Sequence, residues 1–382
     1  MKPGLPVVYL TVFIDLVGFG LILPQLPYYA ERFGATGVWV GAILTAYSAA
    51  QLVGASLLGR LSDRVGRRPV LLLSLAGSAA SFLLSGFAGS LWLLLTARAL
   101  AGLFGGSIAA AQAVIADVTA PRERARYMGL LGAAIGLGFV FGPALGSLLA
   151  RFGFGAAAFS AAGLAAANLV FAFLRLPETR GPDERRHAHS RVDWSNLLDA
   201  LHHPSIGRLL AATFLSTLAF VAMEATFALL GEARFGLGAD RLGFVFTYLG
   251  IVMVIVQGGL VGRLAPRFGE RALATAGALV MAASLAVLPL VPSFAAVLGV
   301  LAGLAVGQGL TTPMLSTLLS RATDADEQGG TLGLGQSLAA AARAVGPIGA
   351  GWLYDRAAGA PYAASAAVMV LAALLVGTLR RD

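Results

Sequence analysis

The chain of 382 residues contains no cysteine, and its four histidines all lie in one short segment. Without cysteine it has no disulfide bond, thiolate nucleophile or thiolate metal site. The histidines are His187 and His189, two positions apart, and His202 and His203, which are adjacent. Neither spacing places two ligands on one face of a helix. We therefore expect no metal site.

Charged residues are also scarce, at 12% of the chain, whereas 58% of residues are hydrophobic and the mean hydropathy is +0.81. No soluble domain has this balance. The formal net charge of +8 would otherwise indicate nucleic-acid binding, but arginines in membrane proteins set the topology and contact anionic headgroups. We expect a protein of the lipid bilayer with no nucleic-acid partner.

Long apolar runs recur along the whole chain. A helix needs about 20 apolar residues to cross about 30 Å of hydrocarbon. Twelve runs meet this need, at 5–30, 37–58, 70–89, 91–116, 127–150, 154–174, 207–230, 241–262, 272–290, 293–319, 330–352 and 361–379. The first run contains Asp15 and exceeds the core of a signal peptide, so we expect it to be retained. The sequence predicts an all-α integral membrane protein with twelve transmembrane helices.

Basic residues are distributed unevenly between the predicted loops. Almost all fall on the side of the N-terminus, and the other side holds only Arg32, Arg151, Arg234, Arg241 and Arg356. Because basic loops stay in the cytoplasm, we expect both termini to be cytoplasmic.

The chain repeats itself at two independent places. The segment 59–68, GRLSDRVGRR, recurs 203 residues later as GRLAPRFGER, and the pair Gly142-Pro143 recurs 204 residues later as Gly346-Pro347. With six helices in each half, the halves have the same orientation and form parallel repeats. We predict a six-helix bundle at 1–174, a cytoplasmic linker at 175–206 and a second six-helix bundle at 207–382.

Glycine and arginine dominate the segment 59–70, GRLSDRVGRRPV, which lies between two apolar runs. Gly59 and Gly66 permit tight turns, and Asp63 can cap a helix or form an ion pair. We predict a short charged hairpin between two membrane helices.

This segment resembles the cytoplasmic loop signature of the major facilitator superfamily. Three other motifs lie in the expected helices. GFVFGPALG at 138–146 is similar to the antiporter signature of the drug:proton antiporter branch, RALAGLFGG at 98–106 to its intramembrane arginine motif, and DLVGFGLILPQLP at 15–27 to the first-helix signature of tetracycline-type efflux proteins. The resemblance covers the whole chain and implies the major facilitator fold of two six-helix parallel repeats.

The resemblance also implies a gate at the loop signature. Its residues would hold the cytoplasmic side shut in the outward-facing state; they are Gly59, Asp63, Arg64, Gly66, Arg67 and Arg68. The second copy has Pro266 in place of Asp63, so a charge latch is expected only in the N-terminal half. The alternative is a loop that only determines topology.

The antiporter motif would create a smooth, bent helix face, because its glycines recur every four residues. The residues are Gly138, Gly142, Pro143 and Gly146. By resemblance this helix moves against its counterpart around Gly346 and Pro347; static close packing is the alternative.

Four charged residues lie inside predicted helices, namely Asp15, Arg98, Glu224 and Arg343, whereas the third, sixth, ninth and twelfth runs contain none. A charge at a helix centre costs at least ~2.5–3.5 kcal/mol, so it faces a cavity or a partner. By helical rise, Glu224 and Arg343 lie at similar depths and can meet, whereas Asp15 and Arg98 differ in depth.

These charges predict proton coupling. Opening and closing of a cavity changes the desolvation of a carboxyl group and its distance from cations, so its affinity for a proton can switch during transport. We predict Asp15 or Glu224 as the proton carrier, with Arg98 and Arg343 modulating it or binding an anionic group. The alternatives are a structural Glu224–Arg343 pair and a helix-packing role for Asp15.

Polar and aromatic residues on the predicted cavity helices are candidates for substrate binding. They are Tyr47, Gln51, Gln112, Phe220, Phe227, Gln257, Gln308 and Gln336. The two phenylalanines lie four and three residues from Glu224, and an acid beside aromatic rings would suit a lipophilic cation. Packing and interhelical hydrogen bonds are the alternative roles.

Together these features predict a monomeric exporter of a bacterial inner membrane, which contacts the lipid bilayer. It would exchange protons for small lipophilic compounds by alternating access, with the proton gradient as its energy source and no cofactor. The alternative is an uncoupled facilitator, or a lipid or metabolite exporter of the same fold. An enzyme is not expected, because no cysteine or histidine lies at membrane depth.

Overall fold

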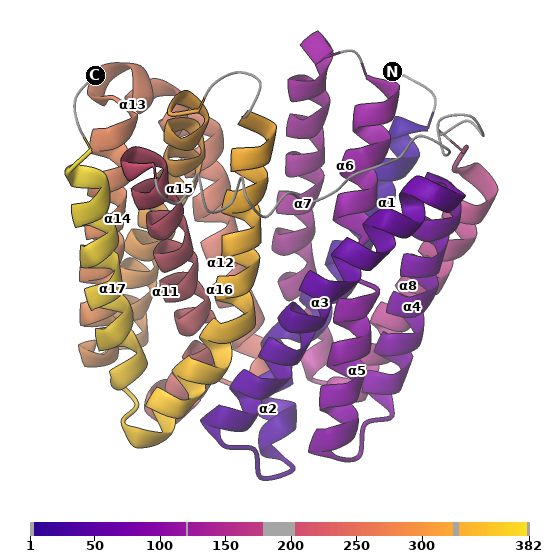
Figure 1. Ribbon diagram of the computed structural model, residues 1–382. Helices are drawn as coiled ribbons and strands as arrows, with labels where there is room; N and C mark the ends of the chain where they lie inside the picture. The colour runs from indigo at the N-terminus through magenta and orange to yellow at the C-terminus, as the bar shows by residue number, and fades with distance from the viewer. Residues whose placement is uncertain (1–3, 120, 179–202, 324–327, 380–382) are drawn as a thin grey trace. The chain divides into compact units, whose positions relative to one another are not determined.

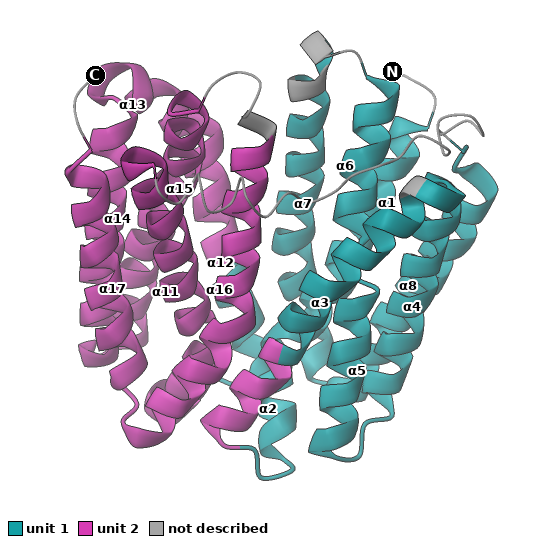
Figure 2. Cartoon of the chain, viewed as in Figure 1, with its two compact units in different colours: residues 1–35, 46–191, 237–247 teal, residues 36–45, 192–236, 248–382 magenta. Residues whose placement is uncertain are grey.

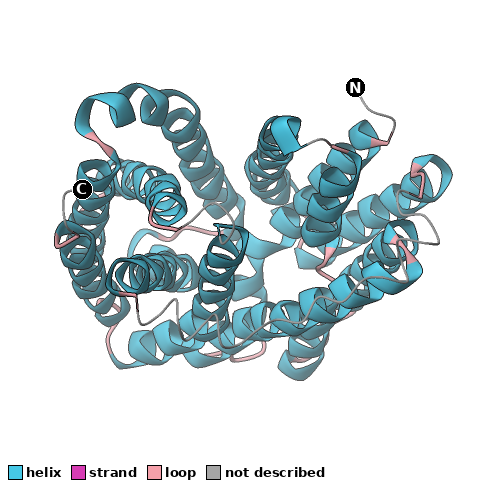
Figure 3. Ribbon diagram, turned by 45° about the horizontal axis from the view of Figure 1, so that its top comes forward, coloured by secondary structure: helices cyan, strands magenta, loops and turns pink. Residues whose placement is uncertain are grey.

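The computed structural model describes residues 4–119, 121–178, 203–323 and 328–379, except for the side chains of residues 63, 121, 122, 124, 125, 328 and 329. Within these ranges the chain forms helices and loops and no strand (Figures 1 and 3). Most of the predicted linker, with His187, His189 and His202, lies outside the described residues.

The chain forms two compact units that depart from chain order at two short segments (Figure 2). Unit 1 contains Met1–Ala35, Ala46–Arg191 and Leu237–Thr247, and unit 2 contains Thr36–Thr45, Val192–Gly236 and Tyr248–Asp382. Each unit therefore includes the first turns of a helix that continues in the other unit.

In the N-terminal half, glycine, serine or proline stands at or next to the start of most helices. They are α1 (Leu5–Ile22), η1 (Leu23–Gln25), α2 (Leu26–Glu31), α3 (Gly37–Val65), α4 (Arg67–Gly86), α5 (Leu91–Leu103), α6 (Ser107–Val118), α7 (Pro121–Ala150) and α8 (Phe154–Arg175). Pro24 lies in the 3₁₀ segment that interrupts the first predicted span, and Pro27 lies in the first turn of α2, where its missing backbone donor is tolerated.

The C-terminal half has the corresponding order of elements. They are α11 (Pro204–Phe235), α12 (Ala239–Ile255), the π-helical η2 (Val256–Leu260), α13 (Val261–Phe268), α14 (Glu270–Val287), η3 (Leu288–Leu290), α15 (Phe294–Arg321), α16 (Gln328–Arg356) and α17 (Ala360–Gly377).

In the described residues, 11 helical spans are long and apolar enough to cross a membrane. They match eleven of the twelve predicted runs. The remaining run corresponds to α16, which has 29 residues and is long enough to cross at 1.5 Å per residue, although its composition is less apolar. The predicted all-α membrane fold is confirmed.

Apolar side chains hold each unit together at the ends where its first helix begins. In unit 1, α1 packs mainly against α7 and α8, and its buried Leu5, Val8 and Val12 contact Leu71 and Ile115. In unit 2, α11 packs mainly against α16 and α17. These contacts align the helices that carry the intramembrane charges.

The predicted charged hairpin at 59–70 is wrong in its geometry. Helix α3 continues through Val65, and only Gly66 separates it from α4. Gly66 adopts a φ of 111°, which favours glycine, whereas Gly59 stays helical. The reason is that Arg, Leu and Ser after Gly59 are tolerated in a helix, so hydrophilicity alone does not end it. The side chain of Asp63 lies outside the described parts of the chain.

The repeat extends to hydrogen bonds at equivalent positions. Gly269 matches Gly66 and has a φ of 79°. Arg68 donates to the carbonyl oxygen of Phe173 at the end of α8, 2.7 Å away, and the equivalent Arg271 donates to the carbonyl of Gly377 at the end of α17. In both halves an arginine thus donates to a carbonyl oxygen at the end of another helix, where that helix has no backbone donor for it.

One ion pair recurs with its charges exchanged. In the first half, Nε of Arg67 lies 2.8 Å from a carboxylate oxygen of Asp117 and joins the start of α4 to the end of α6. At the equivalent places in the second half, Glu270 starts α14 and Arg321 ends α15, and their charged groups are 2.8 Å apart. Both halves therefore hold a charge pair at this place, with opposite polarity.

This exchange predicts that the first pair can be inverted. We expect Arg67→Glu to destabilise the protein by about 1–3 kcal/mol, because Asp117 loses a charged hydrogen bond and meets a like charge. The double variant Arg67→Glu/Asp117→Arg should recover most of the loss. Apparent melting temperatures in detergent measure both, with the exposed Arg64→Glu as the charge control. A double variant no more stable than Arg67→Glu would contradict the prediction.

A carboxylate caps the start of α3 in unit 2. The two oxygens of Asp355, near the end of α16, accept hydrogen bonds from the backbone amides of Gly37 and Val38 at 2.6 and 2.9 Å. A methyl group at Gly37 would lie 2.8 Å from the carbonyl oxygen of Gly351. The glycines allow the contact, and the carboxylate satisfies amides at the positive end of the helix.

We expect Asp355→Ala to loosen this contact. Because the chain has no cysteine, a single cysteine at the buried Val40 can report on it. Thiol labelling of Val40→Cys should become several-fold faster when Asp355→Ala is added, while Asp240→Ala, at an exposed acid, should leave the rate unchanged. Equal labelling with and without Asp355→Ala would show that the cap does not hold the helix.

Candidate functional site

The fourth predicted span, 91–116, is not one continuous helix. Helix α5 ends at Leu103 and α6 begins at Ser107. Two adjacent glycines, Gly105 and Gly106, lie in the break, and glycine costs roughly 0.5–1 kcal/mol relative to alanine inside a helix. The interruption leaves the carbonyl oxygen of Gly105 free for a side-chain donor and presents the hydroxyl of Ser107 at a helix start.

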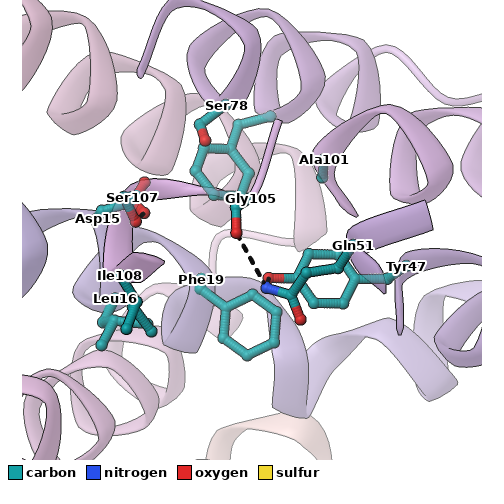
Figure 4. Close-up of a pocket in the computed structure, with 11 residues that line it drawn as sticks. Asp15, Leu16, Phe19, Tyr47, Gln51, Ser78, Ala101, Gly105, Ser107 and Ile108 are labelled. Carbon is teal, nitrogen blue, oxygen red and sulfur yellow. Dashed lines mark hydrogen bonds between the residues drawn. The ribbon is translucent and has the colours of Figure 1, made fainter. Parts of the chain in front are cut away.

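Asp15 on α1 lies beside this break (Figure 4). The hydroxyl of Ser107 donates a hydrogen bond to its carboxylate at 2.5 Å. Ser78 on α4 lines the same cavity. Among the described residues Asp15 makes no ion pair, so its charge is balanced only by neutral dipoles, which is expensive at membrane depth.

The cavity at Asp15 is small, with a volume of about 30 Å³. Its walls are formed by α1, α3, α4 and the broken α5–α6 helix, and include Phe19, Tyr47, Gln51, Phe82 and Ser107. A volume of ~10–15 Å³ suffices for one water, so the cavity can hold a water or two and no drug-sized molecule. It is therefore suited to hydrating or exchanging a proton rather than to enclosing a substrate.

Gln51 links α3 to the helix break. Its side-chain amide donates to the hydroxyl of Tyr47 at 3.1 Å and to the carbonyl oxygen of Gly105 at 3.2 Å (Figure 4). The Tyr47 ring packs against Phe19, with 5.0 Å between ring centroids. The predicted candidates Tyr47 and Gln51 thus lie in the Asp15 cavity and fix the orientation of its polar wall.

Arg98 lies behind the aromatic walls of the same cavity. Its side chain is buried, and its guanidinium lies 5.8 Å from the ring centroids of both Tyr47 and Phe82. Nε and Nη2 have no hydrogen-bond partner, and in the described part of the chain no acid pairs with Arg98. As predicted, Asp15 and Arg98 form no direct pair. Two ring faces partly stabilise the cation, but its charge remains uncompensated.

Close backbone approaches assemble this site. A methyl group at Gly102 on α5 would overlap the carbonyl oxygen of Tyr47 on α3. On the other side of α1, a methyl group at Gly142 of the antiporter motif would lie 2.7 Å from Cα of Gly20. Gly138 and Gly146 likewise face α1, at Leu16 and Leu21. The motif glycines therefore let α7 press against the helix that carries Asp15.

The second acid lies in unit 2 in a different environment. Glu224 on α11 and Arg343 on α16 are close enough to interact electrostatically. Their similar predicted depths made this contact possible. Phe227 is 0% exposed and belongs to the core, whereas Phe220 is partly exposed. Glu224 thus interacts with a cation, whereas Asp15 forms no ion pair with any described residue.

The remaining candidates do not line the Asp15 cavity. Gln112, Gln257 and Gln336 are exposed. Gln308 on α15 is buried, and its Oε1 has no hydrogen-bond partner. Their roles in binding substrate remain predictions.

Sequence reasoning missed the residues that complete the Asp15 cavity. Ser78, Ser107 and Phe82 lie in apolar runs and carry no charge, so nothing in the composition marks them. The one available signal was the Gly105-Gly106-Ser107 triplet, since two glycines followed by a helix-starting serine indicate a break.

Comparison with known proteins identifies the class. The family model of the Major Facilitator Superfamily matches residues 8–347 and 258–382, and the chain belongs to this family of membrane transporters. It is 31% identical to the class B tetracycline resistance protein of Escherichia coli, over 91% of this chain and 88% of that protein. It is 28% identical to multidrug resistance protein 2 of Bacillus subtilis, over 94% and 91% of the two chains.

Solved structures agree with this class. The crystal structure of the human organic anion transporter MFSD10 matches with a TM-score of 0.72 and 27% identity, over 98% of this chain and 100% of that chain. A bacterial homologue of the lysosomal transporter Spinster, in its inward-facing and occupied conformation, matches with a TM-score of 0.79 over 99% and 95% of the two chains. At 13% identity, the latter shows the fold alone.

The Gly102 contact gives a test of the site's assembly. We expect Gly102→Ala to cost about 1–3 kcal/mol by overpacking and to lower activity, because α5 must move away from Tyr47. Gly163→Ala is the matched control, since no atom lies within 4 Å of a methyl group there. Melting temperature and transport measure the two effects. Equal tolerance of both substitutions would show that α3 and α5 are not in close contact.

Proposed function

We propose that the chain exports small lipophilic compounds in exchange for protons, with Asp15 as the proton carrier. The observation that carries this proposal is a carboxyl group at membrane depth that has neutral hydroxyl neighbours, no ion pair in the described residues, and space for water. A carboxylate that is always charged would gain from a cationic partner. A carboxyl group that gains and loses a proton needs neighbours compatible with both forms, and a serine hydroxyl can either donate or accept.

Glu224 has the weaker claim to this role. Its electrostatic interaction with Arg343 opposes the desolvation that burial imposes on the charged acid, and the two residues fit a structural pair between α11 and α16. The roles predicted for Arg98, modulation of the proton affinity of Asp15 or binding of an anionic group, remain proposals, because its guanidinium lies against the rings of Tyr47 and Phe82 and forms no direct pair with Asp15.

The relatives support the direction and the substrate class. Tetracycline resistance proteins from several bacteria and a multidrug resistance protein align over almost the full length of the chain. We infer that this chain is likewise an exporter in a bacterial inner membrane, and tetracycline is the first compound to test. The arginine-rich ends near Arg67 and Arg271 would face the cytoplasm together with both termini.

Proteoliposomes containing an internal pH dye test the coupling. Addition of tetracycline should drive proton flux in the unmodified protein and in Glu224→Gln. In Asp15→Asn the flux should fall to the level of protein-free liposomes, because the amide cannot carry a proton. Asp240→Asn, at an exposed acid in the first turn of α12, is the matched control.

Two results would overturn the proposal. Proton flux that survives in Asp15→Asn would exclude Asp15 as the carrier. Tetracycline movement without proton flux in every variant would establish an uncoupled facilitator of the same fold.

A further inference from the structure

A groove opens at the end of unit 2 where α11 and α14 finish and α17 begins. Its volume is about 620 Å³. The lining is aliphatic except for one cation, and includes Leu230, Arg234, Ala286, Pro289, Leu290 and Ala363. Because these residues occupy helix ends in a membrane transporter, the groove lies at the level of the lipid headgroups.

The first repeat fills the equivalent place with aromatic rings. Phe154 stacks on Tyr29 with 4.0 Å between centroids, and Phe87 meets Phe159 edge-on at 5.0 Å. A methyl group at Gly86 would lie 2.5 Å from the Phe159 ring. In unit 1, therefore, the side chains of the protein itself occupy this position.

The second repeat has smaller residues at the same positions. By the offsets of the repeat, Phe87 corresponds to Leu290, Phe154 to Ala358 and Phe159 to Ala363. Replacing the rings of Phe154 and Phe159 by alanines removes the filling and leaves the groove. Leu290 is 74% exposed and its counterpart Phe87 is 67% exposed, so this position offers an apolar surface for lipid to cover in both halves.

Within the described residues, the cation at the groove pairs with no acid. Arg234 is exposed, and its guanidinium lies 5.7 Å from the ring centroid of Phe235. Glu232 is two residues away, and residues two apart do not face each other on a helix. Helix α17 also begins at this groove without a side-chain cap, which adds positive potential.

We propose that this groove binds an anionic phospholipid, with its phosphate at Arg234 and its glycerol and upper acyl chains against Leu290 and Ala363. A guanidinium prefers phosphate through paired hydrogen bonds, and the aliphatic floor matches the acyl chains. A net negative headgroup is favoured over a zwitterionic one because no acid of the groove lining competes for Arg234. The site is independent of the transport mechanism.

Native mass spectrometry of the purified protein in detergent, supplied with equal amounts of phosphatidylglycerol and phosphatidylcholine, tests this site. The unmodified protein should retain phosphatidylglycerol in preference. Arg234→Gln should retain one fewer phosphatidylglycerol molecule, and Arg234→Lys should retain nearly the original number. The matched control is Arg32→Gln, because Arg32-Phe33-Gly34 corresponds to Arg234-Phe235-Gly236 at the end where the groove is filled.

A filling variant tests the apolar part of the groove. Ala358→Phe/Ala363→Phe copies the first repeat and should lose the same lipid. If that variant does not fold, the surface substitution Arg234→Gln alone decides the question. Unchanged phosphatidylglycerol retention in Arg234→Gln, an equal loss in Arg32→Gln, or displacement of the lipid by excess inorganic phosphate would each overturn the proposal.

Discussion

The cost of placing a charge in hydrocarbon is the constraint on which this structure depends. Each ionisable group at membrane depth must find a partner, a cavity or an aromatic face. The chain uses a different solution at each group: hydroxyls and water space at Asp15, ring faces at Arg98, and electrostatic pairing of Glu224 with Arg343. The solution at Asp15 is the one that tolerates both protonation states, and for that reason we propose Asp15 as the group that couples transport to protons.

The Asp15 site exists because a helix is interrupted and glycines replace side chains around it. The break between α5 and α6 turns Ser107 into a donor for Asp15 and the Gly105 carbonyl into an acceptor for Gln51. Gly102, Gly20 and Gly142 let the flanking helices approach until backbones touch. A helix without these features would cover the carboxyl group with methylene groups and leave no room for water.

The apolar runs and the internal repeat were sufficient to predict the helices, the fold and the intramembrane charges. Hydropathy could not reveal where helices break, because the same residue type lies inside one helix and in the break of another. Helix α3 continues through Gly59, whereas α5 ends before Gly105. Gly105 is followed by a second glycine and a helix-starting serine, whereas Gly59 is followed by residues that a helix tolerates. The roles of Ser78 and Ser107 were hidden because the Asp15 that they surround is distant in sequence. The exchanged charges of the Arg67–Asp117 and Glu270–Arg321 pairs become interpretable only once both contacts are seen.

The most direct test of the central claim is the release of protons when tetracycline binds to the purified protein in a weakly buffered detergent solution, followed with a pH dye. If Asp15 carries the exchanged proton, binding releases protons from the unmodified protein and from Glu224→Gln but none from Asp15→Asn. Proton release that persists in Asp15→Asn and disappears in Glu224→Gln would contradict the account and assign the carrier to unit 2.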